Sequence, residues 1–261
     1  MTKLTAVIRN VAAASILVAA GSSAFAYSVA LWGNNAGFTN LATGAGNSVT
    51  VVTDAQVATA GFLNGFDVFV NTRCDGCFDT QLSNAASTRV KTYATGNAVL
   101  FNGDWFDVPS FNPSASVNQL ILNALAYAGA AGHGYIGEFA GATQAMASNV
   151  EGMLALSLFA GNATSSSHNC CSGDGNVTLT AAGLASSITA PLAGSFPQDP
   201  ANLEFAANLS GVNSADVLAT FANGNAALLA KSGASVPEPG SFALAGLALF
   251  GLGLGRRARK A

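Results

Sequence analysis

The sequence predicts an α/β protein whose mostly parallel sheet is flanked by helices. Before Gly161, short apolar and β-branched runs alternate with amphipathic stretches, which is the pattern of strands joined by helices. Such connections require right-handed crossovers and therefore a parallel core sheet. Between its two terminal segments the chain has roughly 210 residues, which is enough to bury one sizeable core.

Four strands and two helices are predicted in the first half of the chain. The first helix ends at Gly96, because glycine commonly terminates helices. The second is indicated by Val117, Leu120, Ile121 and Leu125, which recur at helical spacing. The predicted strands cover 27–32, 48–53, 66–71 and 98–101, and the predicted helices cover 81–95 and 117–128.

The second half begins with a predicted strand over 134–138 and a predicted helix over 140–156. Beyond Gly161 the composition changes, and 162–176 reads as a polar loop rich in serine. Further short strands are predicted at 177–180, 203–206, 217–221 and 226–230.

The carboxyl ends of the parallel strands are the expected place for a ligand. Open α/β sheets bind ligands in a crevice beyond these ends, so we call this side of the sheet the carboxyl edge. An aromatic face beside carboxylates suits a sugar ring and its hydroxyls, although aromatic anchoring of the loops explains the same residues equally well. The possible ligand cleft consists of Trp32, Asn34, Asp104, Trp105, Glu138 and Phe139.

The charge of the body argues against nucleic acid as a partner. Of 10 Lys and Arg residues, two precede residue 27 and four lie in the last six residues, which leaves four in the body. Twelve of the 13 Asp and Glu residues lie there, for a net charge near −8. A body with so few cations has little means of neutralising phosphates.

Both ends of the chain carry targeting patterns. Lys3 and Arg9 precede an apolar run over 11–21, and Ala24-Phe25-Ala26 is a small-x-small cleavage site. This arrangement predicts a signal peptide over 1–26, cut between Ala26 and Tyr27. At the other end, Pro237-Glu238-Pro239 precedes an uncharged apolar stretch and a basic cluster. The apolar stretch is short for a membrane span, which needs about 20 residues, but it can insert with local thinning and snorkelling of the arginines.

This C-terminal arrangement resembles the PEP-CTERM sorting signal of exported bacterial proteins. The resemblance implies that an exosortase, a membrane transpeptidase-like enzyme, recognises Pro237, Glu238 and Pro239 and cuts nearby. The implied organisation is a signal peptide (1–26), a globular domain (27–231), and a linker with the sorting segment (232–261). Within that segment the motif covers 236–240, an apolar transmembrane helix covers 241–255, and the basic tail covers 256–261.

Four cysteines occur as two close pairs, Cys74 with Cys77 and Cys170 with Cys171. In an exported protein an even count favours disulfides, either between the pairs or between Cys74 and Cys77. A second possibility is a zinc site that adds His168, since these ligand types are suitable for zinc. A third is that the cysteines are free thiols. Because Asp75 and Asp79 would raise the thiol pKa values, a redox role is disfavoured.

The body resembles the class I glutamine amidotransferase-like fold, a flavodoxin-like α/β arrangement. The phrase from Gly132 to Ala142 carries the resemblance, because members of the family have a glycine-flanked strand-to-helix turn there with the nucleophile at its centre. Phe139 occupies the nucleophile position in this chain. Phenylalanine cannot form a covalent intermediate, so the resemblance implies a fold whose catalytic site has been lost or repurposed. No cofactor is expected.

Glu138 and His133 can each be interpreted in two ways. Glu138 is either a catalytic base at a strand end or a strand-end residue that caps the following helix or accepts hydrogen bonds from its amides, and we favour the second. His133 either lines a pocket or is an exposed loop residue, which we again favour. The sequence contains no phosphate-binding loop, nucleotide fingerprint or HExxH motif.

These observations leave three hypotheses. The first is an exported, non-enzymatic protein of the periplasm, cell surface or extracellular matrix, with a polysaccharide of an exopolysaccharide or biofilm as its partner. Signal peptidase and an exosortase would process it, with passage through the inner membrane. The second is a hydrolase of the same fold that uses Glu138 or Asp104 without a covalent step. The third is a structural matrix component.

Overall fold

The computed structural model describes the body of the chain with internal gaps. The described residues are 26–33, 35–72, 82–103, 105–106, 115–139, 157–160, 162–164, 177–192, 206 and 208–233. The predicted signal sequence up to residue 25, the helix over 140–156, all four cysteines and the sorting segment beyond residue 233 lie outside these ranges.

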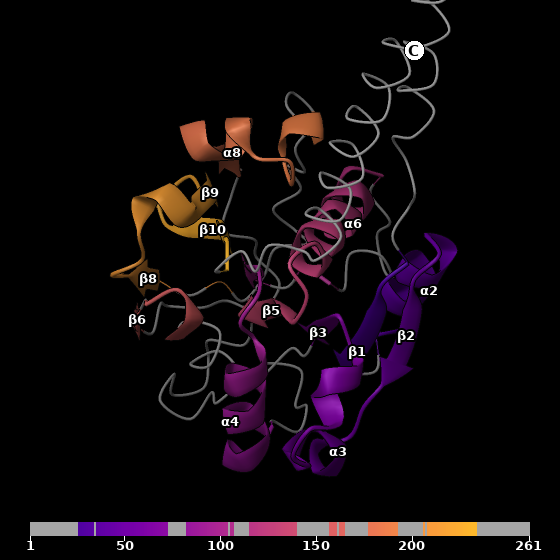
Figure 1. Ribbon diagram of the computed structural model, residues 1–261. Coiled ribbons are helices and arrows are strands. Elements are labelled where there is room, and N and C mark those ends of the chain that lie inside the picture. The colour runs from indigo at the N-terminus through magenta and orange to yellow at the C-terminus, as the bar shows by residue number, and fades with distance from the viewer. Residues whose placement is uncertain are drawn as a thin grey trace, which may run out of the picture.

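A mixed sheet of eight strands forms the centre of the described structure (Figure 1). Its strand order is β2-β1-β3-β5-β4-β10-β9-β7, and the first five strands are parallel. The last three are antiparallel to their neighbours. The strands are β1 (Ser28–Trp32), β2 (Ser48–Val51), β3 (Val68–Asn71), β4 (Ala98–Asn102), β5 (Gly134–Phe139), β7 (Thr178–Leu179), β9 (Val217–Thr220) and β10 (Ala226–Lys231). A separate antiparallel pair joins β6 (Asn162–Thr164) to β8 (Asn208–Ser210).

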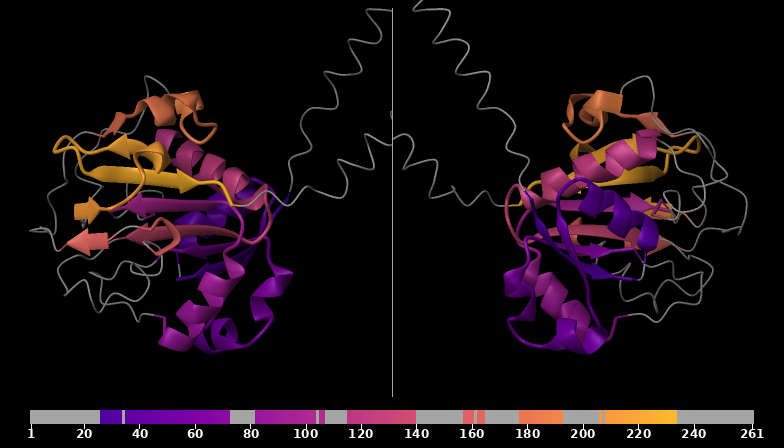
Figure 2. Two further views of the ribbon diagram at one scale, coloured as in Figure 1. Left: turned by 60° about the vertical axis from the view of Figure 1, so that its left-hand side comes forward. Right: turned by 90° about the vertical axis from the view of Figure 1, so that its right-hand side faces the viewer.

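Helices cover both faces of the parallel part of the sheet (Figure 2). One face packs against α2 (Ala36–Gly44) and α6 (Ala115–Gly129). The other packs against α3 (Asp54–Ala58), the 3₁₀ turn η1 (Phe62–Gly65) and α4 (Asn84–Tyr93). The connections through α2 and α6 run in one direction along the sheet, and those through α3 and α4 run in the other. Right-handed crossovers require this change of face with direction.

Strand residues alternate between two hydrophobic clusters, as the period of two demands. In β1, Val29 and Leu31 face the α2–α6 side, whereas Ala30 and Trp32 face the α3–α4 side. The short helix α8 (Ala181–Ala185) and the 3₁₀ turn η4 (Ala190–Leu192) extend the first cluster beside β9. The 3₁₀ turn η6 (Ser214–Asp216) leads directly into β9.

The predicted α/β class and mostly parallel sheet are confirmed, with three corrections. The flavodoxin-like strand order is 2-1-3-4-5, but here β5 lies between β3 and β4. The predicted polar loop over 162–176 begins with strand β6. In the predicted strand 203–206, Ala206 lies outside any strand and β8 follows it.

Three helices, α2, α3 and α8, were missed because their signals are local caps rather than apolar periodicity. The Asn35 side chain accepts a hydrogen bond from the Phe38 amide and so caps α2. Thr53 and Gln56 form a reciprocal capping box at the start of α3.

Candidate functional site

The carboxyl edge gathers buried polar side chains at the ends of neighbouring strands. Asn71, Thr72, Asn102 and Glu138 are all buried, and Asn35 lies just beyond β1. Buried polar groups need hydrogen-bond partners, so their contacts decide whether this edge binds a ligand or holds the fold together.

Glu138 supports the loop that follows β4. Its Oε1 atom accepts hydrogen bonds from the backbone amides of Trp105 and of Phe106, the latter at 2.9 Å. The side chain is only 2 % exposed. The carboxylate therefore anchors two consecutive amides of a loop. The sequence interpretation placed these donors in the helix predicted to follow β5, whereas here they belong to the loop after β4.

The aromatic residues of the predicted cleft lie in the interior. Trp105 is fully buried, its indole Nε1 donates to the Asn102 carbonyl at 2.9 Å, and its ring lies 5.6 Å from that of Phe101. Trp32 is 6 % exposed. Neither presents an open face for a sugar. Asn34, Asp104 and the side chain of Phe139 lie outside the described residues, although the backbone of Phe139 is the last residue of β5.

Two asparagines tie the same loop to its surroundings. Asn35 donates from Nδ2 to the Phe106 carbonyl at 3.0 Å while its Oδ1 caps α2. Asn102 donates from Nδ2 to the Ala226 carbonyl of β10 at 2.6 Å. The loop after β4 is thus fixed from β5, from the start of α2 and through β4 itself, so the described part of this edge is a packed, hydrogen-bonded structure.

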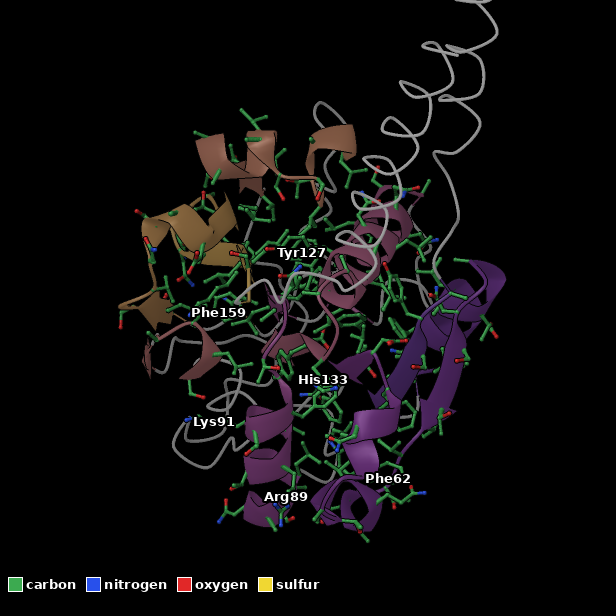
Figure 3. All side chains as sticks on the ribbon, viewed as in Figure 1. Phe62, Arg89, Lys91, Tyr127, His133 and Phe159 are labelled. Carbon is green, nitrogen blue, oxygen red and sulfur yellow. The ribbon has the colours of Figure 1, made fainter. Side chains whose placement is uncertain are left out.

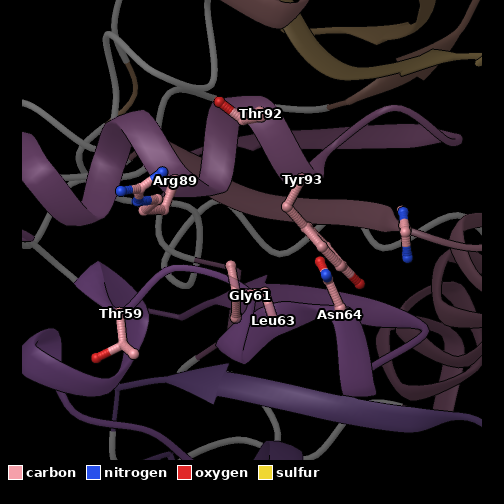
Figure 4. Close-up of a pocket in the computed structure, with 8 residues that line it drawn as sticks. Thr59, Gly61, Leu63, Asn64, Arg89, Thr92 and Tyr93 are labelled. Atoms are coloured by element: carbon pink, nitrogen blue, oxygen red, sulfur yellow. The ribbon is translucent and has the colours of Figure 1, made fainter.

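A surface pocket lies on the α3–α4 side of the sheet. It has a volume of about 190 Å³ and is lined by α3–η1 residues, by α4 residues and by His133 from the turn before β5. Figure 3 shows Arg89 on α4 and His133 beyond it, and Figure 4 shows Tyr93 extending from α4 toward Asn64. The lining residues are Thr59, Gly61, Leu63, Asn64, Arg89, Thr92, Tyr93 and His133.

Tyr93 and Leu63 form the buried part of this pocket, and the other lining residues are exposed. The Tyr93 hydroxyl donates to the Phe66 carbonyl at 2.9 Å, and burial, with Asp67 nearby, raises the pKa of Tyr93. The His133 ring lies 4.8 Å from the Tyr93 ring, and its backbone has φ 49°, a left-handed conformation that is uncommon outside glycine. Asn64, Arg89 and His133 are exposed. Their donors suit a small polar or anionic molecule.

Sequence reasoning missed this pocket because three separate segments build it. His133 was considered and is exposed as expected, yet it also lines the pocket. The sequence offered one clue to this pocket, because Arg89 is one of only four Lys and Arg residues in the acidic body. Within the described ranges, no group of three or more His, Cys, Asp or Glu side chains is arranged to hold a metal.

The body is therefore an α/β domain, and its class of protein is defined by the segment that follows it. Residues 235–260 match the model of the PEP-CTERM protein-sorting motif. The motif marks this chain as an exported protein that an exosortase-type enzyme sorts to the surface. No curated protein and no solved structure matches the chain. Across the ranges that the structure describes, no helix has the length and apolar character to cross a membrane.

Proposed function

We propose that this protein is a non-catalytic, matrix- or surface-associated protein whose body is delivered outside the inner membrane by the sorting machinery. The sorting motif at 235–260 carries this proposal. The amidotransferase-like resemblance belongs to the proposal as well, with Phe139 in place of a nucleophile.

The position of Tyr27 supports signal peptidase cleavage after Ala26. The Tyr27 amide donates to Asn47 Oδ1 at 3.0 Å, and its ring packs against Gly129. Tyr27 thus makes the first tertiary contacts of the described chain, while Ala26 is exposed. A cut at this position would leave the new amino terminus already bound to the body.

The contacts of Glu138 favour a non-catalytic body. A general base must reach the substrate proton within about 3 Å, whereas this carboxylate is buried and bonded to two loop amides. The alternative is a hydrolase that uses Glu138 or Asp104. The hydrolase alternative predicts that the wild type releases sugars from the host's extracellular polysaccharide and that Glu138→Gln, although still folded, does not. Our proposal predicts that neither protein releases sugars.

Glycan binding is a second element of the proposal, and the α3–α4 pocket is the feature that favours it. The guanidinium of Arg89 makes no ion pair within the described structure and can hold a carboxylate with two parallel hydrogen bonds. The amide of Asn64 and the hydroxyls of Thr59 and Thr92 can bind sugar hydroxyls. This chemistry fits a single sugar unit that bears a carboxylate.

The test titrates the mature exported protein with polygalacturonate and, for comparison, with neutral dextran. Loss of a charge-assisted hydrogen bond costs about 1.5–3 kcal/mol, so Arg89→Ala should weaken polygalacturonate binding about 10-fold or more. Lys91→Ala is the matched control, because Lys91 lies on the same helix away from α3 (Figure 3). Equal binding by both variants and the wild type, or equal binding of dextran, would reject this pocket as an acidic-sugar site.

A further inference from the structure

The amino edge of the sheet is the side where β1, β3, β4 and β5 begin, and the body ends there. Strand β10 is antiparallel to β4 and pairs Lys231 with Ala98, so its carboxyl end reaches the start of β4. The left view of Figure 2 shows the yellow β10 arrow ending on the side where α6 also ends. The sorting segment therefore leaves the body from the amino edge.

The chain stays attached to this edge after β10 has ended. The Gly233 amide donates to Asn97 Oδ1 at 3.0 Å. Gly233 also packs directly on the backbone of Thr95 and Gly96, so that a Cβ atom there would overlap the Gly96 carbonyl. The body thus holds the chain to within two residues of the matched sorting region, which begins at residue 235.

The remaining length of chain is short. Pro237 follows Gly233 by four residues, which span at most about 14 Å when fully extended. Phe242, where the apolar stretch begins, follows by nine residues and lies at most about 32 Å away. An enzyme that cuts at the motif must therefore approach the amino edge closely while the body is folded.

The amino terminus of the mature chain lies at the same edge. The Tyr27 hydroxyl donates to the Ala126 carbonyl at 3.4 Å, and Asn97 donates from Nδ2 to the Tyr127 carbonyl at 2.7 Å. The end of α6 therefore connects Tyr27 to the residue that holds Gly233. Both terminal segments therefore join the body at the same edge.

We propose that the amino edge is the surface on which the sorting enzyme acts, and that the carboxyl edge faces away from the membrane during sorting. The proposal adds an interaction surface to the proposed function and rests on it. The enzyme contacts the exposed turns around Thr95 and Ala130, and the opposite edge, with the β9–β10 turn at Asn223, stays clear of it.

Site-specific photo-crosslinking in the native host tests this surface. A benzoylphenylalanine at Thr95 should crosslink to the sorting enzyme, and one at Asn223, which is also exposed, should give at least about 5-fold less adduct. Equal adducts at both positions, or adducts at Asn223 alone, would overturn the proposal.

Two further variants distinguish this proposal from the assignment of the C-terminal segment as a sorting signal. Sixteen Gly/Ser residues inserted between Gly233 and Ala234 should reduce the Thr95 adduct severalfold, because the enzyme can then reach the motif away from the edge. The same insertion between Asn223 and Gly224 leaves the tail spacing unchanged and should have no effect on the Thr95 adduct. If the tail is removed normally but both insertions leave the adducts unchanged, the amino-edge proposal fails while the sorting assignment stands.

Discussion

Glu138 shows at the scale of a single residue how a carboxylate at a strand end can be structural. Its Oε1 atom is the acceptor for two consecutive amides in a buried setting. These amides belong to Trp105 and Phe106, whose rings pack around Phe101. Loss of the acceptor would leave buried donors unpaired and loosen this aromatic cluster.

We therefore expect Glu138→Ala to lower the free energy of unfolding by about 2–4 kcal/mol, because each unsatisfied buried donor costs about 1–3 kcal/mol. In a body of this size the melting temperature should fall by about 5–15 °C. Glu138→Gln keeps an acceptor oxygen and should cost roughly 1 kcal/mol. Urea unfolding followed by circular dichroism measures both, and an alanine variant within about 0.5 kcal/mol of the wild type would refute the anchoring role.

The Tyr93 hydroxyl leads us to expect that the folded protein loses stability in alkali. Burial, with Asp67 nearby, raises the pKa of its hydroxyl in the folded state. The raised pKa means that the protonated hydroxyl contributes to the stability of the folded state. This contribution is fully present below the unfolded pKa of about 10, and it is lost as pH rises above that value because the unfolded state then releases the proton more readily. Unfolding free energies at pH 8 to 11 should fall more steeply for the wild type than for Tyr93→Phe. Parallel curves for the two proteins would contradict this account.

Individual elements show what the sequence can and cannot predict. Helix α6 and strands β3, β4 and β10 were predicted because each buries a regular apolar pattern. Helix α2 was missed because Gly37, Thr39 and Asn40 are poor helix formers, and because its stability depends on distant packing of Phe38 against Phe106, with ring centroids 5.7 Å apart.

The position of β5 between β3 and β4 was also beyond sequence reasoning. Crossovers through α4 and α6 permit either neighbour for β5, and the choice depends on contacts far apart along the chain. In the same way, the carboxyl edge was predicted to gather Glu138 and Trp105, but the hydrogen bond between them and the burial of both side chains depend on the folded loop.

Asn35 links two elements, which allows its two roles to be separated. Asn35→Ser keeps a good helix cap but loses the donation to the Phe106 carbonyl, whereas Asn35→Ala loses both. The alanine variant should therefore be less stable than the serine variant by about 1 kcal/mol. Chemical denaturation of the two proteins gives this difference, and equal stabilities would show that the α2 cap contributes nothing measurable.

At the scale of the whole molecule, the two ends and the body differ in charge. The body is near −8, whereas four cations lie in the last six residues. While the tail is attached, the basic cluster favours the cytoplasmic side of the inner membrane. After both ends are removed, the acidic body has no comparable attraction to anionic lipid. Under the proposed function, processing would therefore convert a tethered protein into one that can leave the membrane.

The C-terminal segment, which matches the sorting motif, is predicted to be removed during export. The measurement is the intact mass and localisation of the protein from its native host, for the wild type and for Glu238→Ala. We expect the wild type to lose both ends and reach the surface or medium, and the variant to keep its tail in the inner membrane. If both proteins keep the tail and fractionate alike, the segment is an ordinary anchor and the claim is wrong.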